Sequence, residues 1–262
     1  MEKVNTYTDY GVCRSSNISV MTNAGWGGNL AGEILFGEPY AVTGKPKSGW
    51  LPVYSEASNS EGWIPASIHH GITEDYYALL ISSDHRITLD VVSNALFKKS
   101  TVHILLGSLI PLSAGELFQP GEQLVYNGEA KALSQKRDAE FFCSIAQLLL
   151  NTPERPGGRT PFGMDAYGWI RLVHRIAGYG LASTSEGAWL QGKEVAEAEI
   201  HPGDLVLLES GKLKRIGILI KDGRCLYCDG MIRVDLIKMG GLFRENQTKP
   251  AWKVLGYRRI LT

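Results

Sequence analysis

The sequence lacks any apolar stretch near the ~18 residues that a helix needs to cross a membrane. Its first residues, 1–6 (Met-Glu-Lys-Val-Asn-Thr), also lack the apolar centre of an export signal. We therefore expect a soluble protein without a membrane segment. The predicted compartment is the cytoplasm if Met1 is the natural start, and the periplasm or the extracellular space if an export signal has been removed.

A surplus of one charge is also missing, because 27 Lys and Arg balance 27 Asp and Glu for a formal net charge of +0. A protein that binds nucleic acid or an anionic membrane surface needs a basic footprint. We therefore expect no nucleic acid among its partners. The composition leaves the oligomeric state open.

Cysteine is scarce. The four residues Cys13, Cys143, Cys225 and Cys228 are too few and too scattered for a disulfide framework in 262 residues. Cys225 and Cys228 have the spacing of half a zinc site or of a redox pair, but no second Cys or His pair lies nearby in the sequence. The P-loop, HExxH, GxSxG and a GxGxxG at a strand–helix junction are absent. We therefore predict no metal and no cofactor.

What the sequence does hold is glycine, 30 residues in all, and short apolar runs separated by turn residues. Such runs are typical of the strands of a small β-barrel. Two sets of runs repeat one rhythm, which indicates a duplicated barrel. We predict barrels at 1–72 and 73–132. The expected strands lie in 34–36, 40–43, 50–54 and 62–64 of the first barrel, and in 85–89, 101–106, 109–112 and 122–126 of the second.

From Ser134 onward the apolar spacing becomes helical. One helix is expected through 139–150, and the Pro- and Gly-rich stretch 151–158 ends it. A second helix begins after Asp165, a plausible N-cap, and ends at Gly178.

A third, short helix can start from Ser183, because Glu186 three residues later completes a capping box. Strands follow, with Asp222-Gly223 as a hairpin turn. Helices first and an antiparallel sheet afterwards predict an α+β domain over 133–262.

Several strings in this domain resemble those of the NlpC-type cell-wall cysteine peptidases, over roughly 145 to 262. They are Gly-Gly-Arg-Thr-Pro-Phe-Gly-Met-Asp-Ala-Tyr-Gly (157–168), His-Pro-Gly-Asp-Leu-Val-Leu-Leu (201–208), Ile-Gly-Ile-Leu-Ile (216–220) and Gly-Tyr-Arg-Arg-Ile (256–260). The preceding barrels resemble the bacterial SH3-like domains of the subgroup that cleaves γ-D-glutamyl-diamino acid bonds of murein peptides. The resemblance implies a multidomain α+β protein, with two SH3-like β-barrels before a papain-like NlpC-type domain that has an antiparallel sheet.

The same resemblance implies that the catalytic positions have changed. The family's nucleophile lies in an Asp-Cys-Ser-Gly string, which here is Asp165-Ala166-Tyr167-Gly168. A methyl group cannot attack a carbonyl. The position of the base is Arg215, whose guanidinium stays protonated, and the third position is Tyr227. We therefore predict no catalytic residues.

The positions that hold substrate in the family also differ. Glu154-Arg155-Pro156-Gly157-Gly158 stands where members usually carry Tyr-x-Trp-Gly-Gly, and Ser183-Thr184-Ser185 stands where the subgroup has Arg-Asp-Ser. Trp50 and Trp63 are expected to fill the first barrel, although exposed aromatics there could form a glycan or peptide platform. Our candidate binding residues are Arg215, Tyr227, Tyr167, Asp165, Ser183, Thr184 and Ser185.

The predicted function is a non-catalytic pseudo-peptidase that binds a peptide, a cell-wall fragment or a protein partner through the former active-site cleft and the SH3-like domains. The alternative is an active murein-peptide endopeptidase with a non-standard nucleophile such as Cys228, and a third possibility is a scaffold whose groove is plugged. We expect Ala166, Arg215 and Tyr227 to cluster, with Ala166 in the first turn of a helix. Arg215 should either pair with Asp165 or Asp229 or point to solvent.

Overall fold

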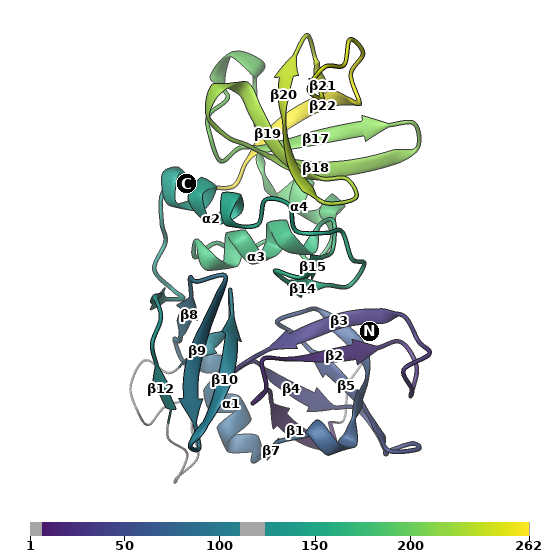
Figure 1. The fold of residues 1–262 in the computed structure, drawn as a ribbon, viewed down its shortest axis with the longest axis vertical. Coiled ribbons are helices and arrows are strands. Elements are labelled where there is room, and N and C mark those ends of the chain that lie inside the picture. The colour runs from purple at the N-terminus through teal and green to yellow at the C-terminus, as the bar shows by residue number, and fades with distance from the viewer. Residues whose placement is uncertain (1–6, 111–123, 262) are drawn as a thin grey trace. The chain divides into compact units, whose positions relative to one another are not determined.

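The computed structural model describes residues 7–110 and 124–261 of the chain. The chain divides into two compact units, labelled by element in Figure 1. The first holds Met1–Ser134 and Pro156–Thr160, and the second holds Gln135–Arg155 and Pro161–Thr262. In the residues described, no helix is long and apolar enough to cross a membrane.

An antiparallel sheet of seven strands opens the first unit, in the order β3-β2-β6-β5-β4-β1-β7. The predicted short apolar runs supply its core, as in the buried Ile34, Val53 and Ile64. Trp50 is buried as predicted, with 8% of its surface exposed. The strands are β1 (Asp9–Val12), β2 (Asn17–Met21), β3 (Leu30–Leu35), β4 (Pro39–Val42), β5 (Trp50–Ser55), β6 (Ser60–Pro65) and β7 (Gly71–Ile72), with the 3-10 helix η1 (Ala66–Ile68) before β7.

A helix that the sequence analysis did not foresee, α1 (Glu74–Ser82), follows this sheet and is capped by the side chain of Thr73. Two three-stranded sheets come next, in the orders β10-β9-β12 and β11-β8-β13. The expected strands at 109–112 and 122–126 lie partly outside the described residues. The strands are β8 (Arg86–Thr88), β9 (Val92–Phe97), β10 (Ser100–Leu105), β11 (Leu109–Ile110), β12 (Leu124–Tyr126) and β13 (Ala130–Ala132).

One apolar cluster joins the two sets of strands in this unit. Phe36, which follows β3, packs in the same cluster as Phe97 of β9 and Ile104 of β10. The rings of Phe36 and Phe97 meet edge to face, with centroids 6.0 Å apart. The two predicted barrel regions therefore share part of their core.

The first unit also contains a short piece of the later sequence, Pro156–Thr160, which includes β14 (Arg159–Thr160). The Arg159 guanidinium forms two hydrogen bonds to the Glu38 carboxylate, at 2.8 and 3.0 Å. The backbone N–H of Arg159 donates to Glu33 Oε2 at 2.7 Å. All three side chains are buried, so the Gly-Gly-Arg-Thr-Pro string is fixed by paired charges.

Three helices open the second unit. They are α2 (Ala139–Leu148), α3 (Gly168–Ile176) and α4 (Ser185–Gln191). The predicted apolar face of the middle helix is confirmed, because Trp169, Ile170 and Val173 are all buried. The predicted cap of the third helix is wrong by one residue. Thr184, not Ser183, accepts the N–H of Gly187, because this spacing puts its hydroxyl over the free amide of the first turn.

The strands of the second unit form a closed antiparallel ring. Six strands are ordered β22-β17-β18-β19-β20-β21, and β21 pairs again with β22. The predicted hairpin at Asp222-Gly223 is confirmed, because both residues have positive φ, at 60° and 66°. The strands are β15 (Gly163–Met164), β16 (Lys193–Val195), β17 (Leu205–Ser210), β18 (Leu213–Leu219), β19 (Arg224–Cys228), β20 (Ile232–Lys238), β21 (Gly241–Phe243) and β22 (Trp252–Arg259), with the 3-10 helices η2 (Glu197–Glu199) and η3 (Lys221–Gly223).

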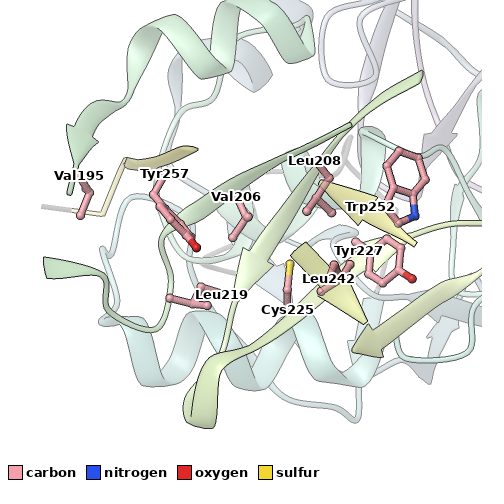
Figure 2. Close-up of a cluster of buried hydrophobic side chains, with 9 residues drawn as sticks. All are labelled: Val195, Val206, Leu208, Leu219, Cys225, Tyr227, Leu242, Trp252 and Tyr257. Carbon is pink, nitrogen blue, oxygen red and sulfur yellow. The ribbon is translucent and has the colours of Figure 1, made fainter. Parts of the chain in front are cut away.

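Buried side chains from these strands form one apolar cluster (Figure 2). Leu208 of β17, Cys225 of β19 and Trp252 of β22 belong to it. Helix α3 contacts β18, so the helical part packs on the sheet, as expected of the α+β domain.

Candidate functional site

The site begins at the turn that carries Ala166, directly before α3. Asp165 Oδ1 accepts the backbone N–H groups of Tyr167 at 2.9 Å and of Gly168 at 3.0 Å. The N-cap of α3 is Tyr167, which makes no side-chain capping bond, so the prediction of Asp165 as the N-cap is wrong by two residues. The Asp165 carboxylate instead binds the amides of the N-cap and of the first helical residue. Ala166 lies within this turn and is half-buried, two residues before α3 begins, whereas we expected it in the helix's first turn. The side chain of Asp165 satisfies the first amides before the backbone becomes helical, which explains the shift.

Arg215 in β18 forms an ion pair with Glu154. Its Nη2 lies 3.1 Å from Glu154 Oε1, and the two side chains are 27% and 21% exposed. Of the two predicted alternatives, an acidic partner or solvent, the structure shows an acidic partner, but neither of the two named candidates, Asp165 and Asp229, supplies it. Asp229 instead accepts hydrogen bonds from Arg244 and from the Trp252 indole N–H.

The backbone explains why Glu154 reaches this position. Its N–H donates to the carbonyl of Gly230 at 2.9 Å, and its Oε2 accepts the N–H of Gly230 at 2.9 Å. Glu154 also forms a parallel bridge with Met164, two residues before Ala166. The segment that follows α2 therefore lies beside both the turn after β19 and the strand before Ala166.

Tyr227 belongs to the apolar core of the strand ring (Figure 2). Its side chain is wholly buried, and its hydroxyl donates to Asp235 Oδ2 at 2.7 Å. Arg233 Nε donates to the same oxygen at 3.1 Å. Burial raises the pKa of this phenol well above its usual range. A ligand-binding role for Tyr227 therefore finds no support in its surroundings.

The thiol of Cys228 responds to the charges of the site. Burial raises its pKa, Glu154 and Asp165 raise it further, and Arg215 lowers it. Successive residues of a strand point to opposite faces, which is why Cys228 meets these groups and Tyr227 does not. Glu154 pairs with Arg215 and bridges to Met164, two residues before Ala166, whereas the Tyr227 hydroxyl belongs to a different network.

Cys228 is a poor nucleophile in this setting. Its side chain is wholly buried, and burial together with Glu154 raises its pKa to about 12. The thiol is therefore protonated at neutral pH, and only the thiolate attacks carbonyl groups. The three other cysteines are also buried, and burial raises the pKa of each of these thiols.

The remaining candidate residues lie near the start of α4. Ser183, Thr184 and Ser185 are exposed. The Tyr167 hydroxyl donates to the carbonyl of Ala182 at 2.6 Å, which ties the turn before α3 to this exposed segment. The second half of the candidate site therefore presents small hydroxyl side chains to solvent.

No replacement base is offered by the histidine of α3. His174 is wholly buried, and its Nδ1 lies 2.8 Å from the carbonyl of Ile170. Burial also lowers its pKa to about 4, and a ring with no exposed surface cannot reach a substrate. Across residues 7–110 and 124–261, no group of three or more His, Cys, Asp or Glu side chains could hold a metal ion.

With this geometry in place, the comparisons identify the C-terminal part. The model of the NlpC/P60 family matches residues 152–249. Residues 152–249 form an NlpC/P60 domain. The predicted resemblance to NlpC-type proteins is therefore confirmed, and the matched residues include Glu154, Ala166, Arg215 and Tyr227.

Three relatives give the NlpC/P60 domain its context. The chain is 24% identical over 220 residues to the gamma-D-glutamyl-L-lysine dipeptidyl-peptidase of Bacillus subtilis (strain 168), covering 74% of this chain and 71% of the relative. The solved structure of an NlpC/P60 family protein from Bacillus cereus ATCC 10987 superposes with a TM-score of 0.75 at 14% identity, covering 97% of this chain and 100% of that one. An NlpC/P60 endopeptidase from Photobacterium damselae subsp. piscicida superposes with a TM-score of 0.68 at 13% identity, covering 98% and 72%. The structural likeness establishes the fold.

Proposed function

We propose that this protein is a non-catalytic member of the NlpC/P60 family that binds a cell-wall peptide or fragment. The observation that carries the proposal is the Arg215–Glu154 ion pair beside the Ala166 turn. A hydrolytic site at this position would need a thiol and a neutral imidazole. This chain instead places a methyl group and a guanidinium there, and Glu154 neutralises the guanidinium.

The chemistry of the pair supports the loss of hydrolysis. A guanidinium cannot accept the proton of an attacking thiol or water, because it stays protonated at any accessible pH. Removal of nucleophile and base together leaves at best the residual rate that binding and oxyanion contacts provide.

Binding is supported by the groups that remain accessible at the former active site. The Arg215–Glu154 pair is partly exposed, and the Ser183–Ser185 segment is exposed. The B. subtilis relative is named for a γ-D-glutamyl-L-lysine bond, so peptides of this chemistry are the first ligands to test. A protein partner at the same surface would use the same groups.

The second candidate function is an active γ-D-glutamyl-diamino acid endopeptidase, which the name of the relative favours. Cys228 is the one thiol that the structure places next to Arg215 and Glu154 among the described residues. Its complete burial and its raised pKa argue against this function.

One pair of measurements separates the two functions. The full chain is incubated with L-Ala-γ-D-Glu-diamino acid peptide, and the products are followed by mass spectrometry while calorimetry measures binding. We expect binding without turnover, and weaker binding when Arg215 is changed to Met. Turnover that disappears in Cys228→Ala would overturn the proposal and establish the endopeptidase. Absence of both turnover and binding would leave the protein as a plugged scaffold and would also contradict the proposal.

A further inference from the structure

One tryptophan of the first unit has an unusually exposed side chain. Trp26, in the loop between β2 and β3, has 71% of its surface exposed. Tryptophan is usually largely buried, because its ring carries one of the largest apolar surfaces of any side chain. The sequence analysis expected Trp50 and Trp63 to fill the first barrel, and Trp50 is buried while Trp63 is half-buried. Trp26 is therefore the exposed ring on which the alternative, an aromatic platform, can be examined.

The loop that carries Trp26 is closed at its base. Thr22 N–H donates to the carbonyl of Asn29 at 2.9 Å, and Asn29 N–H donates to Thr22 Oγ1 at 3.0 Å. At its tip, a side chain added at Gly25 or Gly27 would meet no atom within 4 Å. The ring therefore stands on a fixed base, with open space on both sides of it along the chain.

Trp50 orients the exposed ring. The two indoles meet edge to face, with centroids 5.0 Å apart and ring planes at 76°. In this arrangement one indole offers its edge, so at least one face of Trp26 remains uncovered. A buried aromatic thus holds an exposed one in place, which lowers the entropy lost when a ligand covers it.

The chemistry of the loop narrows the class of ligand that it can bind. Residues 22–29 (Thr-Asn-Ala-Gly-Trp-Gly-Gly-Asn) carry no charge, and the side chains at Asn23 and Asn29 are exposed hydrogen-bonding amides. A flat apolar face next to neutral donors and acceptors complements a neutral, polar ligand that itself has an apolar face. A pyranose ring has this character, because its axial C–H groups form an apolar face and its hydroxyl groups ring the edge.

We propose that the Trp26 loop binds a neutral sugar ring, which stacks on the free face of the indole and is held at its edge by the loop amides. This site belongs to the first unit and does not depend on the proposed function of the NlpC/P60 domain. The two proposals can therefore fail separately.

The test titrates the full chain with tri-N-acetylchitotriose and follows binding by calorimetry and by tryptophan fluorescence. We expect saturable binding that weakens at least about tenfold in Trp26→Ala and less in Trp26→Phe, because phenylalanine keeps a stacking face. Leu190→Ala is the matched control, because Leu190 is an equally exposed apolar residue, at 75%, in the second unit. Its binding should equal that of the unchanged chain.

Three results would overturn the sugar site. The first is absence of trisaccharide binding up to about 10 mM, a concentration that detects even weak sites. The second is equal binding by Trp26→Ala. The third is Trp26-dependent binding of the sugar-free peptide L-Ala-γ-D-Glu-diamino acid in place of the trisaccharide, which would assign the loop to a peptide ligand.

Discussion

At the scale of single residues, the chemistry open to Ala166 and Arg215 depends on whether each side chain can give or accept a proton. The absence of a thiol and an imidazole is readable from the strings around Ala166 and Arg215. The partner of Arg215 is not readable, because Glu154 lies 61 residues away and is brought there by backbone pairing with Gly230. Local spacing cannot report a contact that depends on how two distant segments pair.

Glu154→Gln should destabilise the fold. The change removes the charge that neutralises Arg215 while nearly keeping the shape of the side chain. The pair is partly exposed, so we expect a loss of about 1 kcal/mol in the free energy of unfolding, measured by urea denaturation. Glu194→Gln is the control, because Glu194 pairs with Arg258 but is 82% exposed, and it should change stability little. Equal losses for the two variants would contradict a special role of the Arg215–Glu154 pair.

His174 should make the protein less stable in acid. Burial lowers its folded pKa to about 4, below the usual 6.5, so the unfolded chain takes up this proton more readily. The stability that depends on a neutral His174 is fully present above about pH 6.5. As the pH falls toward 4, the free energy of unfolding decreases by about 3 kcal/mol in all. Unfolding free energies measured across this range should show a shallower fall in His174→Phe than in the unchanged chain. The exposed His103 provides the control, and an equal effect of His103→Phe would exclude this origin.

At the scale of elements, the sequence predicts a feature best where that feature depends only on adjacent residues. Asp222-Gly223 turns a hairpin, as expected, because positive φ depends on adjacent residues alone. Asp165 binds the amides of Tyr167 and Gly168, but the N-cap of α3 is Tyr167, two residues later than expected. Helix α1 was missed, although Thr73 caps it, because its short sequence has two neighbouring tyrosines and no strong apolar face. The pairing of β21 with β22 closes the ring, and nothing in the sequence of either strand predicts it.

Ala166→Cys tests the turn before α3 as an element. The new thiol would lie at the start of α3 in a half-buried position, whereas all four native thiols are buried. We expect iodoacetamide to label the variant at one site within minutes while the unchanged chain stays unlabelled, as measured by intact-mass spectrometry. Hydrolysis of the γ-D-Glu peptide should still be absent, because Arg215 cannot act as a base. Labelling of the unchanged chain at the same rate would show that a native thiol is accessible and would contradict the burial argument.

At the scale of the whole molecule, the sequence indicates where the type of secondary structure changes, but not the path of the chain between the two compact units. The change from strand-like to helical spacing near Ser134 lies next to the division between the units. The prediction placed all of 133–262 in one domain, whereas Pro156–Thr160 belongs to the first unit. Arg159 reaches Glu38 across 121 residues of sequence, and no periodicity in either segment signals such a contact.

Arg159→Met should therefore be among the most destabilising single substitutions in the first unit. It would remove the Arg159 guanidinium from the Glu38 carboxylate, which is wholly buried, whereas Arg159 is 9% exposed in its side chain. Breaking a buried pair from one side costs about 3–5 kcal/mol, which urea denaturation of the full chain would measure. The double variant Arg159→Met with Glu38→Gln should recover part of this loss, because it also removes the buried negative charge that Arg159 faces. Lys221→Met is the control, since Lys221 pairs with Glu140 at 3.8 Å with both side chains largely exposed, and it should cost under about 0.5 kcal/mol. A loss as small for Arg159→Met as for Lys221→Met would mean that the buried pair does not hold this segment in the first unit.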